Sequence, residues 1–227
     1  MFSGMSSGTA ARSTAVDGGR IAVRRAELRR RVLAVSLDLF GKRGIASTPM
    51  SELITAADTS AGAFYGLFPS KDALIQALIE EAIDPVADAI DQLGTKQANP
   101  VMTLGIGLRS TLAIAMHNTD WGHFVGQSTM LNHALERGFR PRVTRDIRQA
   151  QRDGRLQPQD ELVAVALMLG AFQAGVTLAN QGLLTERITS GLTERTLIAI
   201  GADADTAAAV ANLPLPPISV KSEIDLS

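Results

Sequence analysis

The sequence predicts an all-α protein, made of an N-terminal three-helix unit followed by a longer helical domain. Apolar residues recur at the spacing of one helix face along most of the chain, for example at Leu28, Val32, Val35 and Leu39. No segment alternates apolar and polar residues in the manner of a half-buried strand. In addition, residues 57–60 are predicted to make a tight turn between two short helices, as in a helix-turn-helix motif.

The composition is that of a globular protein. The chain has 227 residues, of which 45% are apolar and 20% charged, and no cysteine, which excludes a disulfide scaffold, cysteine catalysis and thiolate zinc sites. The longest unbroken apolar run, over residues 162–172, is much shorter than the roughly 20 residues of a membrane-spanning helix. The first 19 residues lack the apolar segment of a signal peptide. We therefore expect a soluble, cytoplasmic protein without a membrane segment.

Charge is unevenly placed along the chain. Residues 1–43 hold nine Lys and Arg against three Asp and Glu, a net charge of +6, although the whole chain carries −1. This basic end predicts a polyanionic partner for the first part of the chain only. The alternative is a solvated, charged helix face.

The N-terminal part divides into an arm and three helices. Residues 1–19, rich in Ser, Gly, Ala and Thr, are predicted to be a disordered arm, and residues 20–70 to be the helix-turn-helix domain. The first helix is expected to end at Gly41 and Gly44. The next three helices are predicted to begin at Thr48 as N-cap with Pro49 after it, at Ser60, and at Ser70.

The second domain is predicted over residues 71–212. Its first helix should bend at Pro85, and its last helix should break at Gly201. The predicted helices are 71–92, 101–117, 121–135, 139–153, 160–180 and 192–212. Residues 213–227, with three prolines, are expected to be a tail that hangs loose or lies along the surface.

A specific motif runs from Ser60 to Leu74, with the pattern S-x-G-x-F-Y-x-x-F-P-S-K-x-x-L. Together with Gly44 and the Leu39-Phe40 pair, it resembles the N-terminal domain of tetracycline-repressor (TetR) family regulators. The resemblance covers residues 24–80, and the remainder resembles the family only in the number and length of its helices. It implies double-stranded DNA as a partner.

The resemblance assigns phosphate contacts to Thr48, Tyr65 and Lys71. The residues themselves agree, because Tyr65 should diverge from a core-facing Phe64, and Lys71 opens a helix whose free N–H groups attract anions. Each of these residues also has an explanation without DNA. Thr48 and Ser60 would serve as helix caps, Lys71 would be an ordinary surface charge, and Tyr65 would pack against its neighbours. The full set of expected DNA-binding residues is Arg24, Thr48, Ser60, Ala61, Ala63, Tyr65 and Lys71.

The sequence also departs from the family pattern. Asp58 stands where the family has a glycine in the turn, and Asp tolerates a left-handed backbone better than most residues; Thr59 replaces a valine. The outward positions of the recognition helix lack hydrogen-bonding side chains, so direct reading of bases is poor: Ala61, Gly62, Ala63 and Gly66. We hypothesise that specificity depends on operator shape, backbone contacts and the arginines of residues 20–31, which would enter a minor groove.

The resemblance further implies a homodimer. Small residues at helical spacing would let two copies of the helix over residues 160–180 approach closely. The expected interface residues are Leu167, Gly170, Ala171, Ala174 and Leu178, with Gly175 beside them. Ala207, Ala208, Ala209 and Ala211 should extend this face in the last helix. The alternative is that these helices pack within the monomer.

A pocket for a small-molecule effector is also implied, and the central helices offer candidates. Methionine and aromatic side chains adapt to ligands, and a few polar groups could orient one, although the same residues could simply be core. The expected ligand-binding residues are Met102, Met116, His117, Trp121, Phe124, Gln127, Met168 and Phe172, with Leu112, Met130 and Gln173 as further candidates. An apolar or amphipathic ligand is favoured because charged residues are scarce among them.

No cofactor or metal is expected, because His117, His123 and His133 lack the spacing of a helical metal pair and no catalytic motif occurs. The sequence thus predicts a homodimeric transcriptional regulator, not an enzyme, that is released from a palindromic operator by its ligand, most often as a repressor. The alternative is a helical small-molecule carrier without specific DNA binding.

Overall fold

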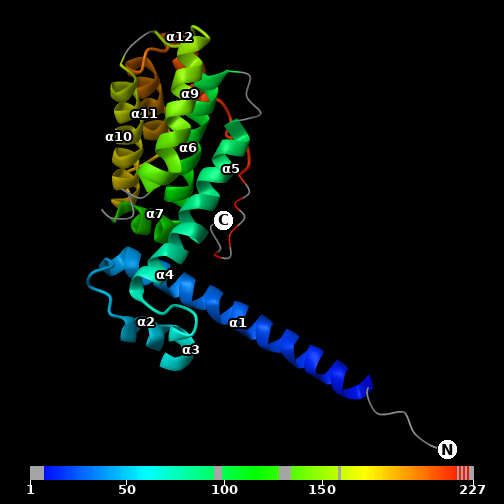
Figure 1. The fold of residues 1–227 in the computed structure, drawn as a ribbon. Helices are drawn as coiled ribbons and strands as arrows, with labels where there is room; N and C mark the ends of the chain where they lie inside the picture. Colours follow the sequence, from blue (N-terminus) through cyan, green and yellow to red (C-terminus); the bar gives the residue numbers. More distant parts are fainter. Residues whose placement is uncertain are drawn as a thin grey trace, which may run out of the picture.

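The computed structural model describes residues 8–94, 99–127, 134–157, 160–218, 220, 222 and 224. Within these residues every regular element is helical, which confirms the predicted all-α class. A small head, made of the end of α1 with α2, α3 and α4, lies beneath an upright bundle (Figure 1).

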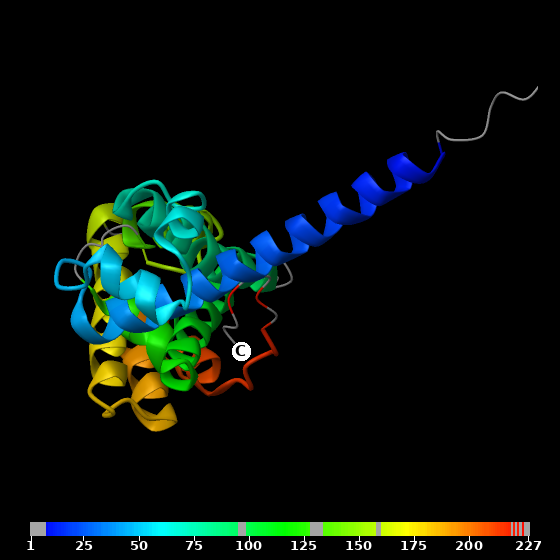
Figure 2. The same cartoon turned by 90° about the horizontal axis from the view of Figure 1, so that it is seen from below.

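Helix α1 (Gly8–Arg43) is far longer than the part that packs in the head. Its last turns bury Val32, Leu33 and Phe40, whereas its N-terminal part projects from the body (Figure 2). The sequence predicts a disordered arm over residues 1–19, but the helix begins at Gly8; residues 1–7 lie outside the described residues. Extending an existing helix fixes one residue per hydrogen bond gained, which favours continuation into an alanine-containing segment.

The expected helix end at Gly41 is wrong, because α1 continues through it to Arg43. Gly41 serves a packing role instead: a Cβ there would lie 3.0 Å from the Cβ of His123 in α7. Gly44 follows the last helical residue and has φ +83, a left-handed conformation that glycine adopts without strain.

The head is completed by three short helices, α2 (Met50–Ala56), α3 (Ala61–Tyr65) and α4 (Lys71–Leu78). The predicted caps Ser60 and Ser70 are confirmed, because their hydroxyls accept hydrogen bonds from the backbone N–H groups of Ala63 and Ala73. The predicted Thr48 cap is wrong. The N-cap of α2 is Pro49, and the Thr48 hydroxyl instead donates to the carbonyl of Gly44.

Helix α4 continues through a π-helical turn, η1 (Ile79–Ile83), into α5 (Asp84–Gly94), so that one rod links the head to the bundle (Figure 1). The sequence predicts one helix with a bend at Pro85. The irregularity is a wider turn that lies directly before this proline. Pro85 has no N–H to donate to the carbonyl of Glu81, so a regular α-helical ladder is interrupted there.

The bundle surrounds α6, which contacts α5, α7, α9, α10, α11 and α12. Close approach is possible because glycines face neighbouring side chains: a Cβ at Gly105 would lie 2.3 Å from Val210, and one at Gly175 would lie 2.4 Å from Leu112. The elements are α6 (Pro100–His117), α7 (Thr119–Gly126), η2 (Ala134–Phe139), α9 (Arg140–Arg152), α10 (Glu161–Asn180), α11 (Glu186–Ala199) and α12 (Ala204–Asn212).

Two predicted helices of the bundle have different bounds. The helix expected over residues 121–135 is α7, which ends at Gly126, and residues 128–133 lie outside the described residues. The helix expected over residues 192–212 is two helices, α11 and α12, separated at Gly201 with φ +100. Helix α11 begins earlier than predicted because Thr185 caps it by accepting from the N–H of Ile188.

Helix α10 is more apolar than its unbroken apolar run suggests. It is 20 residues long and contains an 18-residue window with a mean hydropathy of 2.0, so by length and composition it could cross a membrane, and 44% of that window is buried inside the protein. The unbroken apolar run ends before Gln173, but this is a single polar residue and apolar residues continue after it. The outward half of α10 is therefore an exposed apolar surface of the kind that usually contacts a partner.

Candidate nucleic-acid interface and ligand cavity

The turn between α2 and α3 has the geometry of a helix-turn-helix. Asp58 has φ +47, the only positive φ of a non-glycine residue in the described part of the chain. Ala57 beside it is completely buried, which lets the two helices approach closely. The Arg31 guanidinium in α1 lies 3.5 Å from the Asp58 carbonyl and connects the turn to the first helix. The expectation of a left-handed backbone at Asp58 is confirmed.

The aromatic pair of α3 diverges as predicted. Phe64 has no exposed surface and packs edge-on against Phe68 at a centroid distance of 6.1 Å, whereas Tyr65 is 46% exposed. The buried Phe64 ring thus fixes the rotation of α3 about its axis, because it has a core to fill. Tyr65 is turned outward with its hydroxyl available to a partner.

The outer surface of α3 is small and open. In the part of the chain that the structure describes, no heavy atom lies within 4 Å of the position of a Cβ at Gly62, and Ala61 and Ala63 are exposed. Backbone can therefore approach a groove closely, but these residues carry no side-chain donor or acceptor. Ser60 is exposed as well, with its hydroxyl oxygen already used in the helix cap.

The side chains of Lys71 and Thr48 donate hydrogen bonds to backbone carbonyls of the head. The Lys71 ammonium donates to the carbonyls of Ile45 and Thr48, and it lies 5.6 Å from the centroid of the Phe40 ring. Thr48 has no exposed surface. Both side chains therefore hold the loop between α1 and α2 in place; the Thr48 side chain is buried there, whereas Lys71 is partly exposed and its predicted phosphate contact stays a prediction.

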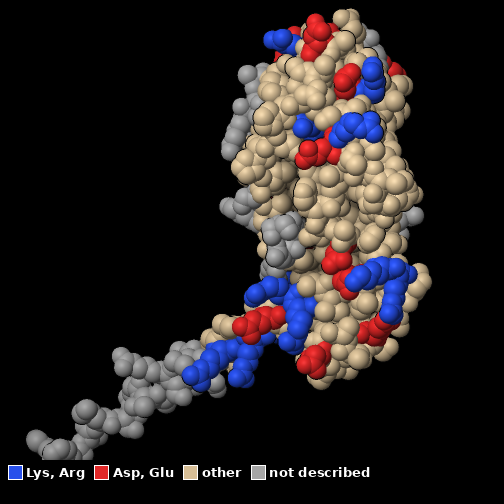
Figure 3. Space-filling view, turned by 180° about the vertical axis from the view of Figure 1, so that it is seen from behind, with Lys and Arg blue, Asp and Glu red and all other residues tan. Residues whose placement is uncertain are grey.

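The arginines of α1 divide into tethered and outward ones. Arg25 donates to the carbonyl of Gly66 at 2.9 Å, and Arg29 pairs with Glu81 at 3.1 Å. Arg20 and Arg24 are exposed further along the helix. Figure 3 shows Lys and Arg side chains gathered where α1 leaves the head. Because Arg25 ties α1 to the C-terminal end of α3, this basic segment lies beside the recognition helix.

A partly open cavity of about 60 Å³ lies between α5, α6, α9 and α10. Most of its wall is apolar, with a few polar groups, and this is typical of a small-molecule site. Its lining residues are Ala87, Ile90, Asp91, Thr103, Leu104, Gly107, Leu108, Thr111, Phe139, Arg142, Val143, Asp146, Met168, Leu169 and Phe172.

The polar part of the cavity wall is a linked group of ion pairs. Arg145 donates to Asp91 at 2.6 Å and to Asp146 at 2.8 Å, and both carboxylates line the cavity. These hydrogen bonds raise the pKa of Arg145. Burial raises the pKa of Asp146, although its hydrogen bond with Arg145 acts in the opposite direction. Arg142, also in the wall, pairs with the exposed Asp88.

Of the predicted ligand-binding residues, Met168 and Phe172 line this cavity. Met116 and His117 line a separate open groove of about 420 Å³ between α6, α11 and the chain after α12. Met102 is half-buried, and Leu112 is fully buried in the core. Gln173 is exposed on α10, and Met130 lies outside the described residues.

The other three predicted ligand residues belong to the contact between α7, the head and the rod. Trp121 and Phe124 are completely buried, and the Trp121 indole N–H donates to the carbonyl of Ala82 in η1. Gln127 donates to the carbonyl of Gly41 in α1 at 3.3 Å. These side chains join the bundle to the head and do not line the cavity.

Sequence analysis missed Asp91, Arg142 and Asp146. A signal existed, because Arg142 and Asp146 are four residues apart and flank the apolar stripe of Val143, Ile147 and Ala150. It was not decisive, since charges beside an apolar stripe usually face solvent.

The predicted dimer residues fall on two faces of α10. Leu167, Gly170 and Ala174 are exposed, and no atom of the described residues lies within 4 Å of a Cβ at Gly170. Ala171 is buried in the monomer, and Leu178 is half-buried against its core.

Three other small residues, expected beside this face, pack within the monomer. Gly175 packs against Leu112, and Ala207 and Ala211 are completely buried. The prediction that Ala207 and Ala211 extend the open face is therefore wrong, because these side chains fill the monomer core. Leu162 and Val163 extend the open face at 68% and 52% exposure.

Comparisons with protein families match both parts of the chain. A family model described as bacterial regulatory proteins of the tetR family matches residues 32–78. A second, described as a tetracyclin repressor-like C-terminal domain, matches residues 99–213, which is more than half of the chain. No curated protein sequence matches the chain significantly.

Solved structures of regulatory proteins also resemble the chain over most of its length. The structure of RolR in complex with the ligand resorcinol is 27% identical, covers 87% of this chain and 100% of its own, and has a TM-score of 0.65. RolR without ligand is 26% identical over 83% of this chain and 99% of its own, with a TM-score of 0.63. FadR from Bacillus subtilis in complex with stearoyl-CoA shares the fold, with 12% identity, coverage of 80% and 96%, and a TM-score of 0.62.

Replacing Asp58 tests the geometry of the turn. Asp58→Val should lower the free energy of unfolding by about 1–2 kcal/mol relative to Asp58→Gly, because a β-branched residue is strained at φ +47 and glycine is not. Both variants remove the same carboxylate, so their difference in chemical denaturation excludes its loss and reports chiefly the strain at φ +47. Equal stabilities would contradict a left-handed turn.

Proposed function

The chain belongs to the tetracycline-repressor (TetR) family of bacterial regulatory proteins, and from that premise we propose how it reads DNA and which effector it takes. It is a DNA-binding transcriptional regulator of the repressor type, with a ligand-binding C-terminal domain and the dimeric assembly typical of the family. Members of the family are in general soluble and cytoplasmic and typically not enzymes, and we propose the same for this chain.

For the operator, we propose a palindrome whose two half-sites receive the two α3 helices in successive major grooves. The exposed Tyr65 hydroxyl, set by the buried Phe64, would donate to a phosphate. Ser60, Ala61 and Ala63 would lie against the groove, where Ala61 and Ala63 offer only methyl groups, and Arg24 would add a backbone contact from α1. Lys71 and Thr48 support this interface indirectly, because they hold the loop before α2.

For the dimer, we propose that the open face of α10 packs on its copy. This face consists of Leu162, Val163, Leu167, Gly170 and Ala174, all exposed in the monomer. Small residues at Gly170 and Ala174 allow close helix approach, and burial of the larger apolar side chains removes apolar surface from water. Helix α11, which contacts α10, would complete a four-helix interface.

For the effector, we propose a neutral molecule with one aromatic ring and two hydroxyl groups. The observation that supports this most directly is the pair of carboxylates, Asp91 and Asp146, that line the apolar cavity and share Arg145. A carboxylate accepts hydrogen bonds, so its ligand must donate, as hydroxyl groups do. The similarity to RolR, whose structure contains resorcinol, adds support.

The volume of the cavity and the charges in its wall limit which effectors can bind. At about 60 Å³ the cavity must widen even for a single ring, since a cavity of roughly 150 Å³ holds benzene. Met168 and Leu169 in the wall could move to admit one ring, but not an acyl chain with a large headgroup. The carboxylates Asp88, Asp91 and Asp146 are largely balanced by Arg142 and Arg145, which favours a neutral ligand over an ion.

Ligand binding would reach DNA through the rod. Helix α5 forms one wall of the cavity with Ala87, Ile90 and Asp91, and it continues through η1 into α4 of the head. A ring that pushes α5 outward would turn the head and change the spacing of the two α3 helices. The regulation is then a coupling free energy between the cavity and the operator.

Tyr65→Phe tests the DNA interface. Wild-type affinity for a palindrome enriched from random duplexes should fall steeply with salt, because phosphate contacts release counterions. Tyr65→Phe should weaken binding of the dimer about a hundredfold, since one charge-assisted hydrogen bond is lost in each subunit, at unchanged stability. Arg24→Ala should instead reduce the slope of log affinity against log salt by about two, because each subunit of the dimer loses one phosphate contact.

The rival function, a small-molecule carrier without specific DNA binding, makes the opposite forecast. It requires that no palindrome is enriched by the purified protein and that Tyr65→Phe leaves the weak affinity for random DNA unchanged.

Asp146→Asn tests the effector site. With resorcinol as the probe, calorimetry should show binding to the wild type and about tenfold weaker binding to the variant, because a hydrogen bond to a charged group is weakened. Asp88→Asn is the matched control, since it changes the carboxylate partner of Arg142 but Asp88 itself does not line the cavity. Binding of benzoate but not of resorcinol would contradict a neutral hydroxylated effector, as would equal losses in both variants.

A further inference from the structure

The chain after α12 returns to the rod instead of ending at the top of the bundle. Its described part, residues 213–218, 220, 222 and 224, is here named the C-terminal strap; it runs beside α5 toward α4 (Figure 1). At its root the Arg109 guanidinium in α6 donates to the carbonyls of Val210 and Leu213. The direction in which the strap leaves α12 is therefore fixed by a side chain of the central helix.

The far end of the strap contacts η1. The Ser222 hydroxyl donates to the backbone carbonyl of Glu81, and the N–H of Ile224 donates to the Ser222 oxygen at 2.9 Å. Ile224 is only 5% exposed, and Val220 packs against the core. Apolar burial on both sides of Ser222 holds its hydroxyl at the rod.

The carbonyl that Ser222 reaches lies at the irregular point of the rod. Pro85 has no N–H to donate to it in the α-helical pattern. The next carbonyl, that of Ala82, accepts from the Trp121 indole. Two consecutive carbonyls of η1 are thus bound by side chains from distant segments, one from α7 and one from the strap.

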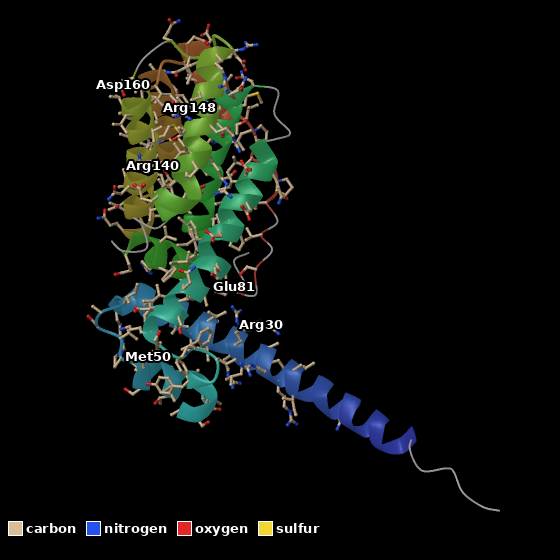
Figure 4. The ribbon with its side chains drawn as sticks, viewed as in Figure 1. Arg30, Met50, Glu81, Arg140, Arg148 and Asp160 are labelled. Carbon is tan, nitrogen blue, oxygen red and sulfur yellow. The ribbon has the colours of Figure 1, made fainter. Side chains whose placement is uncertain are left out.

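Glu81 also joins the strap to the head. Its carboxylate pairs with Arg29 of α1 at 3.1 Å, while its carbonyl accepts from Ser222. Figure 4 places Glu81 where the rod meets the bundle, above α1. A shift of the strap would therefore act on the same residue that connects the rod to the first helix of the head.

We propose that the C-terminal strap is a regulatory element that fixes the orientation of η1 and thereby sets how strongly occupation of the cavity is transmitted to the head. Without the strap, η1 has one hydrogen-bonded support fewer and adjusts locally when α5 moves, so less of the movement reaches α3. The proposal rests on the proposed function for its effect on DNA, but its effect on η1 does not.

The experiment compares the full chain with three variants: a truncation after Leu215, Ser222→Ala, and Ser190→Ala as the matched control, which makes the same change on α11, beside the root of the strap but away from η1. Hydrogen exchange of the amides of residues 79–87 measures the freedom of η1, and emission of Trp121, the only tryptophan, reports its surroundings. The ratio of operator affinities without and with resorcinol measures coupling.

The truncation and Ser222→Ala should speed exchange at residues 79–87 about threefold or more and reduce the affinity ratio by a similar factor, as loss of one hydrogen bond implies. The truncation should also shift Trp121 emission, and Ser190→Ala should match the wild type. If the truncated chain does not fold, the exchange rates and the affinity ratio of Ser222→Ala alone test the proposal.

If residues 79–87 of Ser222→Ala exchange at the wild-type rate, the proposal that the strap fixes η1 is overturned, whether or not the protein binds DNA. Faster exchange with an unchanged affinity ratio would overturn its role in regulation. A full-length chain that binds no operator, or ignores resorcinol, would count against the proposed function instead, and exchange would still test the contact with η1.

Discussion

The hydrogen bond from the Trp121 indole to the carbonyl of Ala82 joins the three parts on which this protein depends. It connects α7 of the bundle to the π-helical turn of the rod, and α7 packs on α1 of the head at Gly41. The indole is completely buried, so this bond is not exchanged for one with water. A change in the orientation of the head would therefore alter the contacts that α7 makes with η1 and with α1.

The irregular turn in the rod suits this arrangement. A straight α-helix from the cavity to the head would transmit movement stiffly, whereas η1 offers carbonyl groups to side chains outside the helix. Asp91 and Asp146, with the shared Arg145, lie at the other end of α5 and give a ligand polar groups to displace or join. The carboxylates there are largely balanced by Arg142 and Arg145, so under the proposed function hydrogen bonding, and not net charge, would select the ligand.

The parts that could be predicted from the sequence depend on local chemistry. Caps at Ser60 and Ser70, the left-handed Asp58 and the divergence of Phe64 from Tyr65 each follow from residues within a few positions of one another. The roles of Lys71 and Trp121 could not be predicted in this way. Their partners, the carbonyls of Ile45 and Ala82, are 26 and 39 residues away, and any helical surface offers such acceptors.

The most direct test of the account is a distance measurement between the two heads of the dimer. The chain has no cysteine, so Ala56→Cys, on the exposed surface of α2, and Ala209→Cys, on α12, accept spin labels cleanly. On adding resorcinol, the distance between the two labels at position 56 should change, while that between the labels at position 209 stays constant. Release of DNA by resorcinol with an unchanged distance at position 56 would contradict transmission through the rod.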